Sequence, residues 1–105
     1  MAPHTYTHPM HATVYILLCA DGSYYVGITR REPEQRLWEH NQRLVEGYTA
    51  SRTPVQLVFA ERFERVVDAI AQERQIKGWS RRKKEALIRG DYEALPDLAS
   101  RPKRK

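Results

Sequence analysis

The sequence predicts one α+β domain whose strands and helices follow each other in the order β-β-α-β-α-α. Two runs rich in β-branched and aromatic residues, 13–19 and 23–29, enclose the turn signal Ala20-Asp21-Gly22 and therefore indicate a hairpin. A third such run, residues 55–62, stands between segments whose apolar residues recur at helical spacing. Because the chain has 105 residues, we expect these elements to share one core.

The register of the predicted hairpin depends on the length of its loop. If Asp21-Gly22 alone formed the turn, Tyr15 and Tyr25 would lie on opposite faces of the sheet. A three-residue loop, 20–22, closed by a glycine in the left-handed region moves the register by one, so that Tyr15 faces Gly27 and shares a face with Tyr25. We favour this loop, because a glycine opposite Tyr15 leaves an open floor where a ligand could approach.

The first predicted helix starts at Pro33, since proline is favoured in the first turn, and runs to about Glu46 with Gly47 as its stop. Helical spacing gives this helix an inner side and, next to it, a polar face. The inner side consists of Leu37, Asn41, Leu44 and Val45. The polar face carries Arg36, His40 and Arg43.

The second predicted helix, from about Val66 to Gly78, has a carboxylate on its core side. Its apolar stripe consists of Val66, Ala69, Ile70 and Ile76. Glu73 belongs to the same stripe by spacing, and a glutamate is costly to bury unless it is paired or binds a cation. Glu73 is therefore the most informative single position in the chain.

The third predicted helix is shorter and is marked at both ends. Ser80 is suited to cap its start, it runs to about Arg89, and Gly90 is its stop. One further turn could dock through Tyr92, Leu95 and Leu98. We expect residues 1–12 to be a flexible leader, residues 13–99 to be the folded domain, and residues 100–105 to be a disordered basic tail.

The net charge of +5 is unevenly distributed along the chain. The body is nearly balanced, so a polyanionic partner has to be argued from local patches. Four cations lie in the tail, namely Arg101, Lys103, Arg104 and Lys105. A second group, interrupted by Trp79, consists of Lys77, Arg81, Arg82, Lys83 and Lys84. The plain alternative for this second group is a solvated helix face.

Membrane proteins and disulfide-stabilised proteins are disfavoured by the sequence. The longest apolar run, residues 14–20, is far shorter than the roughly 20 residues that cross a bilayer. The first residues do not resemble a signal peptide. Cys19 is the only cysteine, which excludes an intrachain disulfide. We therefore expect a cytoplasmic protein without a membrane partner.

The polar candidates together resemble the parts of a phosphodiester hydrolase. Mg²⁺ or Mn²⁺ bound to Glu73 would polarise a phosphate oxygen, and such a cation needs few protein ligands because it keeps several waters. Arg36 would complement the charge that develops in the transition state. A phenol near a cation and an arginine can have a lowered pKa, so Tyr15 could take the proton of the attacking water.

Each candidate also has a plainer interpretation. Tyrosine is common in strands for packing alone, and a lone histidine such as His40 is more often structural than catalytic. Arg36 with Glu39, and Glu73 with Lys77, could be ordinary ion pairs on helix surfaces. The core-side spacing of Glu73 favours the catalytic interpretation, because an exposed ion pair has no need to sit on a core stripe.

The order and spacing of these motifs resemble the GIY-YIG nuclease superfamily, and most closely its small single-domain bacterial members. The resemblance rests first on Thr13-Val14-Tyr15, Tyr25-Val26-Gly27, Arg36 with His40, and Glu73. It extends to Tyr48-Thr49, Arg52, Pro54 and the stretches 76–81 and 83–88, and so covers about residues 13–98. Two positions depart from the family pattern: Thr13 replaces a glycine, and no asparagine follows Glu73.

The resemblance implies a fold, a reaction and a set of roles. The fold would be a three-stranded antiparallel sheet flanked by helices, and the reaction a metal-dependent endonuclease cleavage of DNA in repair or processing. Tyr15 would be the general base or its partner, Tyr25 a second phenol, Arg36 the transition-state cation, His40 a proton or phosphate contact, and Glu73 the ligand of one Mg²⁺ or Mn²⁺. Single-stranded or branched DNA would be contacted by Arg43, Tyr48, Arg52, Lys77, Trp79, Arg81, Arg82, Lys83 and Lys84.

Two interpretations from other classes remain open beside the nuclease. The first is a non-catalytic module that binds single-stranded DNA or RNA, in which Trp79 stacks on a base, an interaction worth roughly 1 to 3 kcal/mol. The second is a protein-interaction domain with a solvated basic helix. Cleavage of DNA in the presence of Mg²⁺ or Mn²⁺ separates the nuclease from both.

Overall fold

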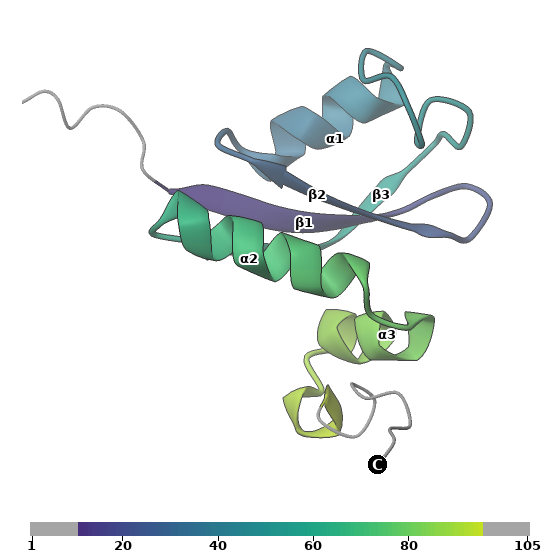
Figure 1. Cartoon of the computed structure of the whole chain (residues 1–105). Helices are drawn as coiled ribbons and strands as arrows, with labels where there is room; N and C mark the ends of the chain where they lie inside the picture. Colours follow the sequence, from purple (N-terminus) through teal and green to yellow (C-terminus); the bar gives the residue numbers. More distant parts are fainter. Residues whose placement is uncertain (1–10, 96–105) are drawn as a thin grey trace, which may run out of the picture.

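The computed structural model describes residues 11–95 and forms a three-stranded antiparallel sheet with helices on both faces (Figure 1). The strands are β1 (Ala12–Leu18), β2 (Tyr24–Thr29) and β3 (Gln56–Phe63), in the spatial order β2-β1-β3. Helix α1 (Pro33–Asn41) covers one face, α2 (Val66–Lys77) crosses the other, and α3 (Arg81–Arg89) lies beyond α2. A short 3₁₀ turn, Tyr92–Ala94, follows α3. The predicted α+β fold and element order are confirmed.

The hairpin has the register that the three-residue loop predicts. The backbone N–H of Cys19 donates to the carbonyl of Ser23 at 2.8 Å, and Gly22 has a positive φ of 85°. Tyr15 consequently pairs with Gly27, and Leu17 with Tyr25. Because side chains alternate along a strand, both tyrosines project from the same face of the sheet.

Helix α1 is shorter than predicted, because it ends at Asn41 in a Schellman motif. Arg43 takes the left-handed conformation that glycine usually supplies, with φ 59°, and the N–H of Leu44 donates to the carbonyl of Glu39 at 2.9 Å. The prediction of a helix to Glu46 is therefore wrong, and so is the inward position of Leu44, which is exposed. Arg43 also leaves the face of Arg36 and His40, and its Nε donates to Thr53 Oγ1 at 3.3 Å.

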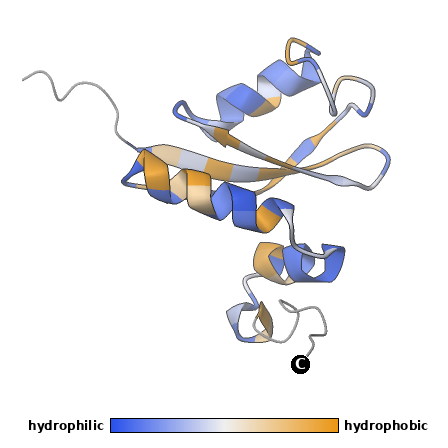
Figure 2. Ribbon diagram, in the orientation of Figure 1, coloured by the Kyte–Doolittle hydropathy of each residue, from blue (hydrophilic) through white to orange (hydrophobic). Residues whose placement is uncertain are grey.

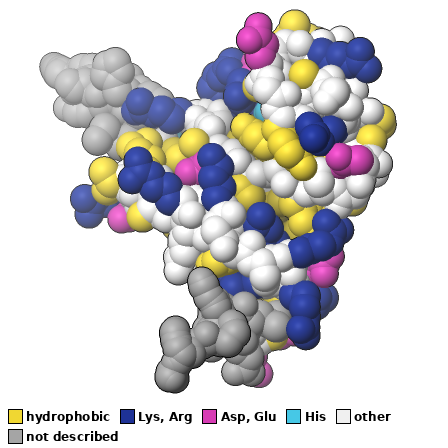
Figure 3. Space-filling model, turned by 45° about the vertical axis from the view of Figure 1, so that its right-hand side comes forward, with side chains coloured by type: hydrophobic (Ala, Val, Ile, Leu, Met, Phe, Trp, Pro, Cys, Tyr) yellow, Lys and Arg dark blue, Asp and Glu magenta, His cyan; other side chains and the backbone are white. Residues whose placement is uncertain are grey.

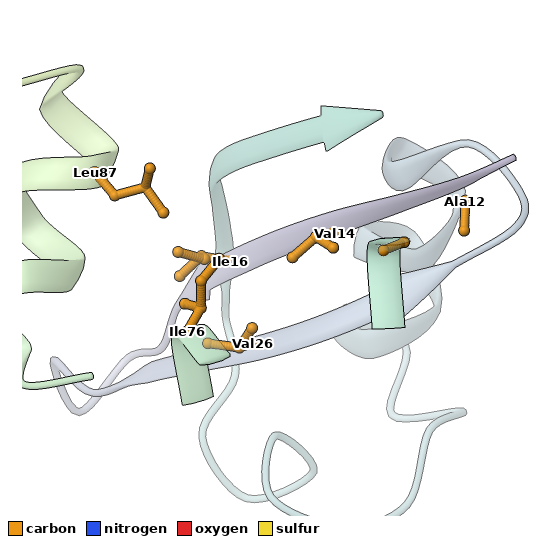
Figure 4. Packing of buried hydrophobic residues seen from close by; sticks show 7 residues of the cluster. Ala12, Val14, Ile16, Val26, Ile76 and Leu87 are labelled. Atoms are coloured by element: carbon orange, nitrogen blue, oxygen red, sulfur yellow. The ribbon is translucent and has the colours of Figure 1, made fainter. Parts of the chain in front are cut away.

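The core lies mainly between the sheet and α2. Side chains from β1, β2, α2 and α3 meet there (Figure 4), namely Ala12, Val14, Ile16, Val26, Ala69, Ile76 and Leu87. In agreement with this, α2 carries several apolar residues, whereas α1 is mostly hydrophilic (Figure 2). Ile70 does not join its predicted stripe, because 37% of it is exposed.

The remaining boundaries differ little from the predictions. Ala12, assigned to the leader, is fully buried in β1. Ser80 caps α3 by accepting from the N–H of Lys83 at 3.1 Å, and Gly90 ends it with φ 77°. Residues 1–10 of the predicted leader, Leu98 and the basic tail lie outside the described residues. Within residues 11–95, no helix is long and apolar enough to cross a membrane.

Candidate active site

A buried row of three polar side chains crosses the space between the sheet and α1. Tyr15 on β1, His40 on α1 and Thr49 in the loop after α1 are each no more than 1% exposed. The hydroxyl of Tyr15 lies 3.1 Å from His40 Nε2, and His40 Nδ1 lies 2.7 Å from Thr49 Oγ1. Burial of polar groups is costly unless they are hydrogen-bonded, and this row satisfies both nitrogens of the imidazole.

Gly27 makes room for the Tyr15 phenol. A Cβ at this position would overlap the Cζ and hydroxyl of Tyr15. The expectation of an open floor for a ligand is therefore wrong in its detail, because the tyrosine ring itself fills the space above the glycine. The absence of a side chain at Gly27 is needed to let the Tyr15 hydroxyl reach His40.

A row of aromatic rings connects this buried group to the surface. The ring centroid of Tyr25 lies 5.2 Å from that of His40 and 6.4 Å from that of Tyr15. Tyr48 stacks on Tyr25 with 22° between the ring planes and is 42% exposed. The guanidinium of Arg52 lies 3.8 Å from the centroid of the Tyr48 ring. Tyr25, Tyr48 and Arg52 thus extend the site from the core to solvent.

Arg36 is a cation that acts on both members of the buried pair, because it lowers the pKa of Tyr15 and of His40. Its Nη1 lies 2.7 Å from Glu39 Oε1, so the ion pair of the plainer interpretation does form. The lowering of the Tyr15 pKa is an influence that an ordinary surface ion pair would not have on a buried side chain. Glu39 also pairs with Arg31 at 3.1 Å. Arg36 therefore shares the Glu39 carboxylate with a second arginine.

Burial sets the protonation of the pair. Burial raises the pKa of the Tyr15 phenol, and the hydrogen bond from Arg36 lowers it by less. Burial also lowers the pKa of His40, and the charge of Arg36 lowers it further against the opposing charge of Glu39. The phenol is therefore protonated and the imidazole neutral near pH 7. The predicted lowering of the Tyr15 pKa is not produced by these side chains.

Glu73 lies on α2, which covers the other face of the sheet. Its side chain is only 12% exposed, as its core-side spacing predicts, and its Oε2 accepts from Lys77 Nζ at 2.7 Å. Lys77 lines a hollow of about 300 Å³ together with Tyr25, Tyr48 and Lys84. The structure thus brings Tyr15, Tyr25, Arg36 and His40 together directly, while Glu73 is connected to them through Lys77.

The side chains around Glu73 decide which kind of metal ion it could hold. Within residues 11–95, no group of three His, Cys, Asp or Glu side chains is arranged to hold a metal ion. Glu73 would therefore be a single carboxylate ligand. This donor set suits Mg²⁺, which keeps several waters and is commonly bound through one or two carboxylates together with substrate phosphates. It does not suit a fully protein-bound ion such as structural zinc.

The predicted nucleic-acid contacts fall into two groups. Lys83 is 5% exposed, and its Nζ lies 3.8 Å from the centroid of the Trp79 ring, which packs against the core. Burial lowers the pKa of Lys83. The Lys83 ammonium and the Trp79 ring are each occupied by their cation–π contact with the other. This disfavours a phosphate contact by Lys83 and base stacking by Trp79.

The other predicted cations are placed at the surface. Arg81 lies 4.5 Å from the centroid of the Tyr24 ring and donates to the Gly22 carbonyl at 2.7 Å, and Arg82 is exposed. Arg52 pairs with Asp21 at 2.9 Å. On the face shown in Figure 3, Lys and Arg side chains border groups of apolar and aromatic side chains.

Thr49 is the site residue that the sequence did not single out by its chemistry. It lies in the loop between α1 and β3, so neither helical nor strand periodicity reports its direction. The only available signal was its place in the matching Tyr48-Thr49 pair.

Comparison with known proteins identifies similar chains of similar length. The family model described as the GIY-YIG catalytic domain matches residues 11–86. A UPF0213 protein of Natronomonas pharaonis is 45% identical over 75 residues, which is 71% of this chain and 87% of that one. A UPF0213 protein of Staphylococcus saprophyticus is 43% identical over 75 residues, 71% of this chain and 90% of that one. These names state no activity.

Two solved structures are also similar. The solution NMR structure of a UPF0213 protein from Bacillus halodurans is 37% identical, has a TM-score of 0.51 and covers 88% of this chain and 100% of its own. The solution NMR structure of a protein from E. faecalis is 34% identical, has a TM-score of 0.52 and covers 90% of this chain and 95% of its own.

Proposed function

The chain belongs to the family of GIY-YIG catalytic domains, and on that premise we propose that it is a metal-dependent endonuclease that hydrolyses phosphodiester bonds in DNA. The observation that carries the proposal is the buried contact of Tyr15 with His40, at 3.1 Å, beside Arg36, which lowers the pKa of the same phenol. A pair that served packing alone would have no need to bury two titratable groups against a cation.

Because the pKa of Tyr15 is raised, its phenol needs a base, and His40 takes that role. A phenol with a raised pKa loses its proton at neutral pH only if a base accepts that proton. His40 is neutral, and its Nε2 lies at hydrogen-bond distance from the Tyr15 hydroxyl. As Tyr15 removes a proton from the attacking water, its own proton passes to His40 Nε2. Arg36 stays charged and stabilises the negative charge on the phosphoryl oxygens.

The proposed metal is Mg²⁺ or Mn²⁺, held by the Glu73 carboxylate. When bound, it would supply Lewis-acid stabilisation of a phosphate oxygen. In the structure, the Lys77 ammonium is paired with that carboxylate, and Lys77 also lines the hollow beside Tyr25. Because more than half of the Lys77 side chain is exposed, its ammonium can move into solvent or onto a phosphate without disturbing the core.

The proposed path of the DNA follows the hollow and the cations beside it. Lys77 and Lys84 line the hollow, and burial lowers the pKa of Lys84, with Arg81 contributing. A phosphate placed there would favour the charged form of Lys84 and form charge-assisted hydrogen bonds. We propose single-stranded or branched DNA as substrate, in repair or processing, because the domain is small and presents only local basic patches.

One observation favours the non-catalytic binding module as the second candidate. Glu73 forms an ion pair with Lys77 at 2.7 Å, so its position on the core side is explained without a metal. In that case the domain would bind nucleic acid through the same cations, and the tyrosine–histidine pair would be structural.

The test uses cleavage of single-stranded, duplex and branched DNA with Mg²⁺ or Mn²⁺, and two variants that separate the functions of Glu73. Glu73→Gln keeps the shape but removes the charge, and should abolish cleavage while DNA affinity stays nearly intact. Lys77→Met breaks the same ion pair but keeps the carboxylate, so it should retain metal-dependent cleavage with somewhat weaker DNA binding.

The pattern across the variants decides between the candidates. Loss of cleavage in Glu73→Gln alone supports a carboxylate that acts on a cation. Equal behaviour of both variants would mean that Glu73 serves only as the partner of Lys77. If the wild type cleaves none of the substrates with either metal, and Glu73→Gln binds DNA as the wild type does, the binding module replaces the enzyme.

A further inference from the structure

The direction of each hydrogen bond along the buried row can be derived from the donors that are present. Arg36 lowers the pKa of the Tyr15 phenol, and because a guanidinium can only donate, the Tyr15 oxygen is the acceptor in their interaction. The Tyr15 proton then needs an acceptor, because the side chain is 1% exposed. Nε2 of His40, at 3.1 Å, is in position to accept it. A proton on Nε2 would instead leave the Tyr15 proton facing another proton.

The protonation of Nδ1, the other nitrogen of the His40 ring, follows from that of Nε2. A neutral imidazole carries one proton, so an unprotonated Nε2 requires a protonated Nδ1. Thr49 Oγ1 lies 2.7 Å from Nδ1 and can accept that proton. The row therefore runs in one direction, from the guanidinium through the phenol and the imidazole to the threonine hydroxyl.

We propose that Thr49 is a positioning residue that holds His40 in the tautomer protonated on Nδ1, and so keeps Nε2 free to receive the Tyr15 proton. Thr49 acts through His40 and touches no substrate. This inference rests on the proposed function for its catalytic consequence, but the tautomer itself is a property of the folded protein.

The loop that carries Thr49 is built to hold it in place. The carbonyl of Thr49 accepts from the N–H of Arg52 at 2.9 Å, and the carbonyl of Tyr48 accepts from Arg52 Nη1 at 2.7 Å. Arg52 is itself tied to Asp21 in the hairpin loop at 2.9 Å.

The end of the loop is fixed as well. The side chain of Asn41 accepts from the N–H of Val55 at 2.7 Å and donates to its carbonyl at 3.0 Å. The threonine hydroxyl therefore meets the imidazole from a loop anchored on both sides, as positioning of a tautomer requires.

The first measurement is the ¹⁵N chemical shift of the two imidazole nitrogens of His40, by NMR on the whole chain at neutral pH. We expect the shift of Nδ1 to report a protonated nitrogen and that of Nε2 an unprotonated one. Thr49→Ser keeps the hydroxyl and should preserve both shifts. Thr49→Val removes it at nearly constant volume and should shift the equilibrium toward protonated Nε2.

Single-turnover cleavage gives the catalytic consequence. The Thr49→Val chain should lose about 10- to 1,000-fold in the rate of the chemical step, because a wrong histidine tautomer costs up to about 10⁴-fold where the histidine is a base. DNA affinity should remain as in the wild type, and Thr49→Ser should restore most of the rate. Loss of affinity in step with rate would indicate a structural role instead and would overturn the proposal.

The measurement of the His40 tautomer tests the role of Thr49 separately from the proposed nuclease activity. A wild-type His40 protonated on Nε2 overturns the inference about Thr49, whether or not the protein cleaves DNA, and does not require any variant to fold. Unchanged imidazole shifts in a folded Thr49→Val chain overturn it as well. The predicted tautomer in a protein that cleaves no DNA would support the positioning by Thr49 and contradict the proposed nuclease.

Discussion

The two faces of the sheet use the same strands for different purposes. Toward α2, strand β1 presents Ala12, Val14 and Ile16, all fully buried among apolar neighbours. Toward α1, alternate positions of the same strand present Tyr15 and Leu17, and Tyr15 contacts a buried histidine. The first face is a conventional apolar core, whereas the second buries groups that can transfer a proton.

The difference indicates how a small domain holds a row of buried polar side chains. Burial of apolar side chains stabilises the folded state without requiring a particular orientation of partner groups. One face of the sheet can therefore supply most of the folding free energy. Buried polar groups stabilise little in net terms and have to be satisfied one by one, which makes their geometry specific. A strand that alternates between the two faces places the polar row on a rigid support.

Truncation on the apolar face should have the largest effect on stability. Ile16→Ala removes a fully buried side chain and should lower the free energy of unfolding by about 2 to 5 kcal/mol. Urea unfolding followed by circular dichroism measures this. Tyr15→Phe, at the preceding position along β1 and on the other face, should cost less than Ile16→Ala. It leaves the buried His40 Nε2 without a partner, which costs about 1 to 3 kcal/mol. A larger loss from Tyr15→Phe would contradict the division between the faces.

Adding one methyl group at Gly27 should disturb the polar face selectively. A Cβ there overlaps the Tyr15 phenol, so Gly27→Ala should cost about 1 to 3 kcal/mol and displace the hydroxyl from His40. Gly78→Ala is the matched control, because a Cβ at Gly78 meets only the Gln75 carbonyl at 3.7 Å. Equal losses of stability and of the Tyr15–His40 contact in both variants would show that Gly27 has no special role.

The pH dependence of stability should show a smaller effect of the same buried pair. The pKa of His40 is lowered by burial and by Arg36, while Glu39 opposes the shift and Tyr15 and Tyr25 complete its surroundings. Since the folded pKa lies below the unfolded one, stability is fully present above the usual histidine pKa of about 6.5 and is lost as pH falls below it.

The comparison of the wild type with a His40→Gln chain isolates this contribution. The difference between their free energies of unfolding should shrink as pH falls below about 6.5, because only the wild type loses the contribution of a neutral His40. A constant difference across that range would mean that burial does not shift the His40 pKa.

Much of the fold follows from local signals in the sequence. The glycine at the end of 20–22 and the alternation around Tyr15 predict the register of the hairpin, and Ser80 and Gly90 predict both ends of α3. The end of α1 could not be predicted in this way. Arg43 takes the left-handed conformation there, and no local pattern distinguishes such an arginine from an ordinary helical one.

The candidate site could be predicted only in part, for a similar reason. Helical spacing places Arg36 and His40 on one side and Glu73 toward the core, and the structure agrees. The spacing of residues along the sequence does not indicate that Lys83 packs inward against Trp79. It also does not indicate that the loop after α1 brings Thr49 within hydrogen-bond distance of the His40 imidazole. Both depend on contacts between segments that are distant in sequence or lack periodicity.

The central claim is that the polar face of the sheet performs the chemistry, and Tyr15→Phe tests it most directly. The measurement is the single-turnover rate of DNA cleavage with Mg²⁺ or Mn²⁺, with each protein in excess and at concentrations that saturate the DNA. We expect a loss of about 10²- to 10⁴-fold in rate with the protein still folded and still binding DNA. A folded Tyr15→Phe chain that cleaves at the wild-type rate would contradict it.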